Sequence, residues 1–550
     1  MLKTPLKRWL LAADALRSDD PDLKAAAAAA APASPTLAIE RPYRSVSFQN
    51  WPVLRSDTVP LACVVRMPAD EKTHLTAASS TTQGGLQEPG KYERYYVLTL
   101  LVWLNVLNYC DRALLTSFAN FIMPDLALTA TQLGILTGFG FTTIYAFMGI
   151  ISGSIADAVH RPRLIAVGMC LWSVLTAVSG FAQGFFGLLL PRVFVGIGES
   201  ILAPSALSLI ADYFPPSHLA MATGFFGSAV HLGVGLSLLL AGLLGENVGW
   251  RPVFFSLGAV GVCLALSVPL VVRELRIAER SRGVSADRFR SGVASLCDNL
   301  ALAASLYARV PSLSLVTAGA VGLGWAGAAQ SFLQPWMVQE RGFTRTEAAL
   351  SAGLVVLTVG AAANPLNGIL ADRAYRRTGL PKVSFAALGL VCVQLPAAIC
   401  FLLGTEARSV LFWASLAAWL LGGAVYGPVV SALQELSPPP LQGTMLGLGI
   451  LVINLFGAGL GNLVFGVLVD MLTAAGAVHP LTTTMVGFVL VSTCMQAVCF
   501  LAAGWRFEKD VKQVRKLIQE AQNASAVRTD AASFIAEWEA SRASRVEASA

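Results

Sequence analysis

The stretch GSIADAVHR at 153–161 recurs as GILADRAYR at 368–376, and both copies read Gly-x-x-Ala-Asp-x-x-x-Arg. Each copy ends an apolar run, so each predicts a helix that stops at a membrane surface. Glycine lets a neighbouring helix approach closely, and an aspartate four residues before an arginine shares its helix face. We predict two gating loops, which contain Gly153, Asp157 and Arg161 and, in the second copy, Gly368, Asp372 and Arg376. Matched copies indicate a chain built from two related halves.

Composition places the chain in a membrane. Of its 550 residues, 55% are hydrophobic and 13% are charged, whereas about 25% of a soluble protein is charged. A helix needs about 20 apolar residues to cross a bilayer, and lipid admits only helices or closed barrels. Twelve runs qualify, all too long for barrel strands: 95–122, 132–156, 163–183, 186–212, 220–244, 251–272, 312–339, 346–371, 382–403, 409–435, 442–471 and 480–504. We predict an all-α polytopic membrane protein with twelve transmembrane helices in two pseudo-symmetric six-helix bundles.

The runs divide the chain into five parts. Residues 1–93 hold an alanine run and many prolines without a sustained period, which predicts a disordered tail. Two six-helix bundles at 94–275 and 312–504 flank a charged linker at 276–311. Residues 505–550 form a basic, polar tail, whose first part has the spacing of an amphipathic helix on the inner leaflet. Basic loops follow spans two, six and eight; since basic loops stay in the cytosol, we predict that the linker and both termini are cytosolic.

Charged residues inside the predicted spans are the strongest functional signal. Asp111 and Arg112 lie in span one, while Arg192 lies two turns before Glu199 in span four. A charge near the bilayer centre is costly unless it is paired or hydrated, so we predict an ion pair between Arg112 and Glu199. Adjacent residues on a helix point about 100° apart, which would leave Asp111 partly unpaired as the protonation site. The structural alternative is an ion cluster that only holds helices together.

Uncharged polar residues of several spans are candidates for the lining of a central cavity. They are Asn105, Asn108, His231, Gln330, Gln334, Asn364 and Asn454. His231 also fits a hydrogen-bonded interior histidine, which is the commoner use of a lone histidine in a span. Aromatic side chains near the two glutamines give this part of span seven a mixed amphipathic surface.

Three further stretches accompany the paired loops: NYCDR at 108–112, PRVFVGIGE at 191–199 and SLIADYFP at 208–215. Together they resemble the Spinster branch of the major facilitator superfamily, specifically over about 95–275 and only generally over 312–504. The resemblance implies bundles that alternate access to a midplane cavity. It also implies roles in proton coupling and gating for Asp111, Arg112, Arg192 and Glu199.

The resemblance predicts a secondary active transporter, surrounded by membrane lipids and coupled to protons, that moves an amphipathic anionic lipid or lysolipid. Trp325, Phe332 and Trp336 are then expected to flank its acyl chain. An organic-anion or sugar-acid symporter of the same superfamily stays open, because that branch also shows Asn-Tyr-x-Asp-Arg in span one. A non-transporting receptor with the same fold is the second alternative. No Gly-x-Ser-x-Gly or His-Glu-x-x-His motif occurs, and five scattered histidines offer no metal site, so we predict no enzyme, cofactor or metal. A net charge of +6, with basic residues in short loops, predicts no nucleic-acid partner.

Overall fold

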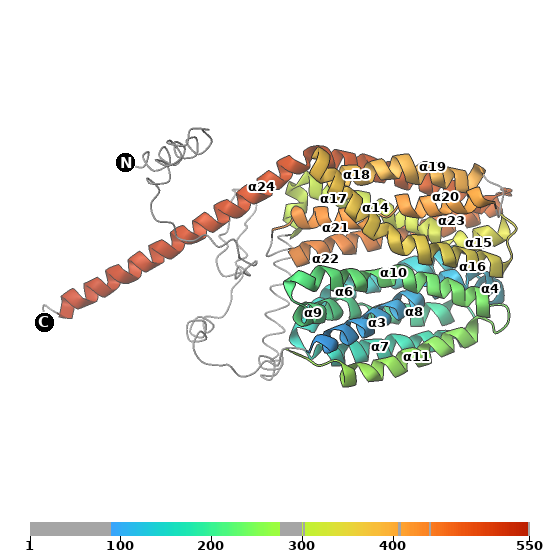
Figure 1. Ribbon diagram of the computed structural model, residues 1–550, viewed down its shortest axis with the longest axis horizontal. Coiled ribbons are helices and arrows are strands. Elements are labelled where there is room, and N and C mark those ends of the chain that lie inside the picture. The colour runs from blue at the N-terminus through green and yellow to red at the C-terminus, as the bar shows by residue number, and fades with distance from the viewer. Residues whose placement is uncertain (1–89, 276–299, 301–302, 405–408, 439–441, 548–550) are drawn as a thin grey trace, which may run out of the picture. The chain divides into compact units, whose positions relative to one another are not determined.

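The computed structural model describes residues 90–275, 300, 303–404, 409–438 and 442–547, and these residues form helices joined by short connections (Figure 1). Eleven of the described helices are long and apolar enough to cross a membrane. A further helical run over 130–158 lies where the second span is predicted. The predicted all-α fold of twelve spans in two six-helix bundles is confirmed, and the chain is a multi-pass membrane protein. Most of the predicted N-terminal tail and linker lies outside the described residues.

Six spans form the N-terminal half. In chain order its elements are α3 (Lys91–Ser117), α4 (Ala119–Asp125), α5 (Ala130–Gly134), the π-helical η3 (Ile135–Phe139), α6 (Gly140–Ala158), α7 (Arg161–Ser179), α8 (Phe185–Glu199), α9 (Leu202–Tyr213), α10 (Pro216–Leu244) and α11 (Trp250–Val271). Local chemistry sets their ends: Thr129 and Gln132 form a reciprocal capping box at the start of α5. Span four divides into α8 and α9 directly after Glu199, which places this carboxylate at a helix break inside the membrane.

The C-terminal half repeats the plan with more π-helical interruptions. Its elements are α14 (Pro311–Ser331), α15 (Leu333–Gln339), α16 (Arg345–Val355), η4 (Val356–Gly360), α17 (Ala361–Thr378), α18 (Lys382–Gly389), η5 (Leu390–Gln394), α19 (Leu395–Ile399), η6 (Cys400–Gly404), α20 (Val410–Gly422), α21 (Tyr426–Glu435), α22 (Gln442–Val452), η8 (Ile453–Gly459), α23 (Leu460–Ala474) and α24 (Pro480–Glu547). Helix α24 continues past the last predicted span without a break. Asp510 on this extension accepts the backbone N–H of Ser312 at 2.9 Å and so caps α14.

Several helix pairs join the halves, among them α5 with α23 and α10 with α16. Glycine permits the first contact, because a Cβ on Gly134 would collide with the backbone of Asn462, and one on Gly466 with the backbone of Ala130. Asp470 at the end of α23 accepts the backbone N–H groups of Ala130 at 3.0 Å and of Thr131 at 2.8 Å. This carboxylate therefore caps the N-terminus of a helix in the other half.

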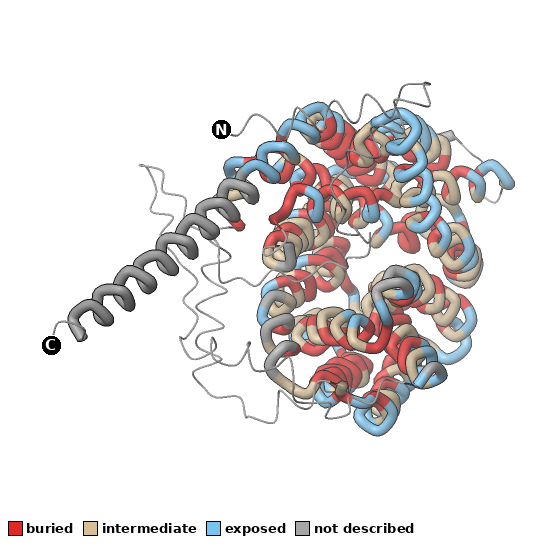
Figure 2. Tube along the Cα trace, turned by 60° about the vertical axis from the view of Figure 1, so that its left-hand side comes forward, coloured by how far each residue is buried: buried red, intermediate tan, exposed pale blue. Residues whose placement is uncertain are grey.

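The same end of the membrane domain, which also carries α4 and α15, holds a further bond between the halves. Asn120 donates its side-chain N–H to the backbone carbonyl of Gln334 at 2.9 Å. Figure 2 shows buried residues where the helices face one another and exposed residues on their outer sides. Large apolar side chains such as Trp103 and Leu270 are exposed, as lipid contact requires.

Candidate functional site

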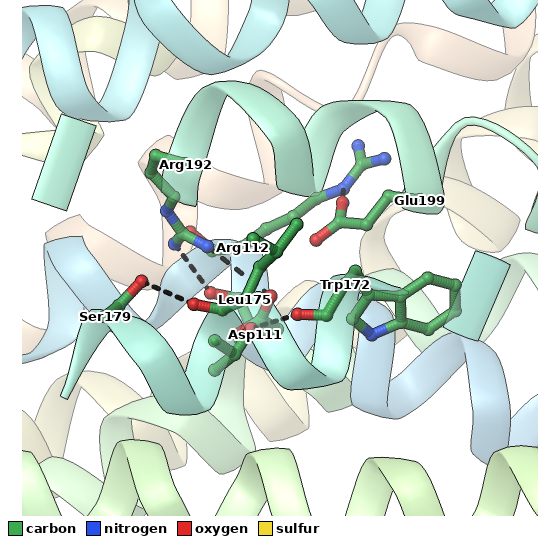
Figure 3. Close-up of polar contacts among 8 residues, drawn as sticks. Asp111, Arg112, Trp172, Leu175, Ser179, Arg192 and Glu199 are labelled. Carbon is green, nitrogen blue, oxygen red and sulfur yellow. Dashed lines mark hydrogen bonds and ion pairs between the residues drawn. The ribbon is translucent and has the colours of Figure 1, made fainter. Parts of the chain in front are cut away.

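An ion pair joins spans one and four. Arg112 on α3 donates from Nε to Glu199 Oε2 at 2.6 Å, as the sequence predicted (Figure 3). The Glu199 side chain is fully buried, whereas that of Arg112 is 20% exposed. In Figure 3 the two terminal nitrogens of Arg112 point away from Asp111. The other Glu199 oxygen, Oε1, is buried and has no hydrogen-bond partner among the described residues. The pair thus combines a cation within reach of a ligand and a carboxylate with one unpaired oxygen.

Asp111 is not left unpaired, which corrects the expectation from the sequence. Arg192 on α8 places Nη1 at 3.4 Å from Asp111 Oδ2 and donates from Nη2 to the Asp111 carbonyl at 2.8 Å (Figure 3). The Thr176 hydroxyl on α7 donates to Asp111 Oδ1 at 2.8 Å. Because Arg192 and Glu199 are two turns apart on one helix, α8 supplies a partner to each of the adjacent charges on α3.

An aromatic enclosure of three rings surrounds the guanidinium of Arg112. The centroid of the Tyr145 ring lies 4.0 Å from Arg112 Cζ, that of Tyr109 5.0 Å and that of Phe141 5.2 Å. Aromatic faces attract a cation and exclude water from one side of it. Sequence reasoning missed this enclosure, although Phe141 and Tyr145 stand four residues apart and so share a face of span two.

Glycines of α8 bring the enclosure and the ion pairs together. A Cβ on Gly198 would lie 2.6 Å from the carbonyl oxygen of Gly168 on α7. One on Gly196 would lie 3.1 Å from the backbone of both Phe141 and Tyr145 on α6. Because these positions carry no side chain, α8 packs against both helices, and Glu199 lies beside the rings that surround its partner.

The two predicted gating loops differ in the structure. Arg161 is fully buried and forms ion pairs with Glu274 and, at 2.6 Å, with Asp212. Sequence reasoning missed Glu274, which follows span six and also accepts the backbone N–H of Arg161 at 3.0 Å. The surroundings of Gly153 and the side chain of Asp157 lie outside the described residues' detail.

The second loop is open. A Cβ on Gly368 would have no atom within 4 Å, so the close helix approach expected there is absent from the described structure. Asp372 pairs with Lys382 at 3.0 Å, and Arg376 is exposed. The difference arises because the first loop has two carboxylates from spans four and six beside it, whereas the second has a lysine.

The predicted cavity-lining residues have different surroundings. Asn105 donates to the backbone carbonyl of Phe226 at 2.9 Å, and Asn454 donates to the carbonyl of Ile450 on its own helix at 3.0 Å. Asn108 is buried, Asn364 is half-buried, and the half-buried His231 lies beside Gly360 of the other half. Both glutamines, Gln330 and Gln334, line a cavity between the halves, described below.

The aromatic side chains expected to flank an acyl chain are mostly enclosed. Phe332 and Trp336 are fully buried in the core of the C-terminal half. Trp336 donates to the Thr482 hydroxyl at 2.7 Å, and Phe332 stacks on Phe465 with ring centroids 4.4 Å apart. The structure therefore contradicts the expectation for these two residues, because the helix break at Phe332 directs them into the bundle. Trp325 is half-buried and stacks on Phe488.

The cavity between the halves has a volume of about 70 Å³. Helices α3 and α10 of the N-terminal half and α14, α15, α16, η4 and α20 of the C-terminal half contribute to its wall. The lining residues are Thr116, Ser117, Val234, Leu238, Gln330, Leu333, Gln334, Ala352, Val356, Leu416, Trp419 and Leu420. The cavity shares α3 with the Arg112–Glu199 pair.

Known proteins resemble the chain over most of its length. The sequence profile of the Major Facilitator Superfamily matches residues 101–462. An MFS-type efflux pump of Mycolicibacterium smegmatis is 30% identical over 77% of this chain and 95% of its own length. The probable galactarate/D-glucarate transporter GarP of Escherichia coli is 26% identical over 76% of this chain and 95% of its own. The crystal structure of a bacterial homologue of the human lysosomal transporter Spinster, inward-facing and unoccupied, is 26% identical, with a TM-score of 0.62 over 78% of this chain and 99% of that one.

Proposed function

Because the chain belongs to the Major Facilitator Superfamily and is a transporter rather than an enzyme, we propose that it moves an organic anion by proton-coupled alternating access. The Arg112–Glu199 pair carries this proposal. Its cation is partly exposed inside an aromatic enclosure, and its carboxylate keeps one oxygen without a partner. A ligand carboxylate and a proton can therefore compete for the two members of one pair.

The coupling follows from charge balance. Arg112 stabilises the Glu199 carboxylate while no anion is bound. A proton on Glu199 removes that charge, and Arg112 then pairs with the anionic group of the substrate. When the anion leaves, Glu199 gives up its proton and pairs with Arg112 again. Asp111, held by Arg192 and Thr176, keeps α3 and α8 in register during this exchange.

The substrate class follows from the surroundings of Arg112. Several relatives are named as transporters of hydrophilic organic anions, among them the GarP protein. Phe332 and Trp336, which would have flanked an acyl chain, are enclosed in the core. These observations favour a small hydrophilic organic anion. The likeness to the Spinster homologue supports a second candidate, an amphipathic anionic lipid or lysolipid.

Uptake into proteoliposomes tests coupling and substrate together. Glucarate and lysophosphatidylglycerol are each offered with and without an inward-directed proton gradient. Glu199→Gln should keep exchange of labelled for unlabelled substrate but lose accumulation driven by the gradient. Asp111→Asn is the matched control and should keep gradient-driven accumulation. If only Asp111→Asn loses it, Asp111 is the coupling site and the assignment to Glu199 is wrong.

We also propose that both termini are cytosolic, since the basic loops follow spans two, six and eight. In this orientation the contacts of Asp470 and Asn120 close the outer side of the membrane domain, as in an inward-facing state. A cysteine introduced at Arg282 should react with impermeant maleimide only after the cells are opened. Labelling of intact cells would show that the orientation is the opposite of the one proposed.

A further inference from the structure

The cavity between the halves contains polar groups that its own wall does not satisfy. Ser117 Oγ, Gln334 Oε1 and Trp419 Nε1 are all buried and have no hydrogen-bond partner among the described residues. These three residues are 2%, 3% and 1% exposed, and all three line the cavity. Buried polar atoms are nearly always hydrogen-bonded, so three in the wall of one cavity indicate partners that enter it.

Two of the three groups are held in place. Gln334 donates from Nε2 to the Ala348 carbonyl at 3.3 Å, which leaves its side-chain oxygen as the free acceptor. Its backbone carbonyl accepts from Asn120 of the other half. Trp419 is packed against Phe401, with ring centroids 5.8 Å apart, and its indole N–H can only donate. The residues that line the cavity therefore include a buried acceptor and a buried donor that are held in place, together with a serine hydroxyl that serves as either.

This set of groups selects the chemistry of a ligand. A hydroxyl group both donates and accepts, so hydroxyls satisfy all three wall atoms. An acyl chain would satisfy none of them and would leave them desolvated. None of the residues that line the cavity is charged, so this wall offers no counter-ion to a carboxylate.

The cavity lies next to the proposed anion site. Thr116, which lines it, is four residues after Arg112 on α3, so both face the same side, about 6 Å apart along the helix axis. Gln330, also in the wall, is exposed. A molecule a few ångströms longer than a carboxylate can therefore place its acid group at Arg112 and its other end in the cavity.

We propose that this cavity is a hydroxyl-binding subsite and that the substrate is a polyhydroxylated carboxylic acid with its carboxylate at Arg112. The assignment of the carboxylate rests on the proposed function, whereas the subsite rests on Ser117, Gln334 and Trp419. Hydrogen bonds to buried groups discriminate strongly between ligands with and without a hydroxyl. The subsite should therefore set specificity, while Arg112 sets the affinity for any carboxylate.

The test compares two probes of similar chain length. Binding of gluconate, which carries hydroxyls, and of hexanoate, which does not, is measured by calorimetry on the purified full-length protein in nanodiscs. Wild-type protein should bind gluconate at least about 10-fold more tightly than hexanoate. Trp419→Phe keeps the ring but removes the N–H, and Ser117→Ala removes the hydroxyl. Each should reduce the preference for gluconate several-fold, because gluconate loses a hydrogen-bond partner whereas hexanoate loses none.

The outcomes separate the two proposals. If Arg112→Ala abolishes binding of both acids while Trp419→Phe and Ser117→Ala leave the preference for gluconate intact, the subsite is wrong and the anion site stands. If Arg112→Ala binds both acids as the wild type does, the proposed anion site fails. Wild-type protein that binds gluconate no better than hexanoate, or not at all, overturns the subsite, and the cavity then holds water only. Unchanged melting temperatures of the two subsite variants show that they fold.

Discussion

Among the described residues, the buried ion pairs lie in the N-terminal half, whereas the stack of rings around Phe412 lies in the C-terminal half. Arg112, Arg192 and Arg161 pair with carboxylates inside the first half. In the second half, the ring centroids of Phe401 and Phe412 lie 4.4 Å apart. Trp336 and Trp419 pack against these two rings. An ion pair of this half, between Lys382 and Asp372, is partly exposed. Buried charge is thus concentrated in the first half of the described chain, although both halves contain aromatic packing.

The halves also differ in helix regularity. Four of the five π-helical segments in the described residues, η4, η5, η6 and η8, lie in the C-terminal half, and η3 lies in the other. Such segments interrupt regular helical hydrogen bonding and often occur at functional sites. η4 contacts α10, and both η3 and η8 lie where span two meets span eleven. Because of these interruptions, the helices of the second half are the less regular ones in the described part of the chain.

Removal of Arg112 should have the largest effect on both stability and transport. Arg112→Ala leaves the buried Glu199 carboxylate without its cation, which should lower the free energy of unfolding by about 3 kcal/mol. If the free energy of anion binding falls by the same amount, uptake at limiting substrate concentration should be about 100-fold slower. Uptake and chemical unfolding of purified protein are the measurements. The double variant Arg112→Ala/Glu199→Gln should recover stability but not transport; recovery of transport would show that the pair is only structural.

Truncating the aromatic core should affect stability without changing the chemistry. Phe412→Ala removes a fully buried ring and should cost about 3–5 kcal/mol of unfolding free energy. Uptake per folded molecule should stay close to that of the wild type. The matched control is Leu403→Ala on a side chain that is 59% exposed, which should change neither. A loss of proton coupling in Phe412→Ala would contradict the expectation that this ring contributes to stability alone.

Asp470 joins the two halves, and its removal should shift the equilibrium between the inward-facing and the outward-facing state. Asp470→Ala removes the two hydrogen bonds that reach the start of α5 from the other half, an interaction worth about 1 kcal/mol. The ratio of the inward-facing to the outward-facing state should therefore change about five-fold. Spin labels on cysteines that replace the exposed Phe181 and Val478 measure the distance between the two halves. The population with the longer distance between the labels should grow. Glu246→Ala, which removes an exposed carboxylate outside the predicted gating loops, should leave the distances as in the wild type. Equal distributions in all three proteins would exclude a closing role for Asp470.

The smallest effect is expected at Asp125, outside the membrane spans. Desolvation opposes its ionisation, but hydrogen bonds from Trp250 and Arg251 and the charge of Arg251 hold the pKa of Asp125 below its usual range. A lowered pKa means that the ionised side chain stabilises the fold at neutral pH and that this contribution disappears as pH falls through the folded value. Below about pH 4, the melting temperature should fall less steeply in Asp125→Asn than in the wild type. Parallel curves would contradict this.

The sequence located the spans and one ion pair. Apolar length alone identified twelve helices, because lipid penalises any unsatisfied backbone. The pairing of Arg112 with Glu199 was predicted because lipid also penalises an unpaired charge. The partner of Asp111 was missed, since the choice between two carboxylates for Arg192 depends on how closely α8 packs on α6 and α7. That distance is set by Gly196 and Gly198, and a helical pattern does not reveal it.

The sequence by itself therefore determined the number of helices, the duplication and the presence of buried charge, all of which follow from local composition and spacing. Tertiary structure alone decided which face of each helix meets another. It enclosed Phe332 and Trp336, placed Glu274 against Arg161, and brought Ser117, Gln334 and Trp419 around one cavity. The physical reason is that hydropathy sets how deep a residue lies in the membrane. Rotation about the helix axis is set by close packing between segments far apart in the chain.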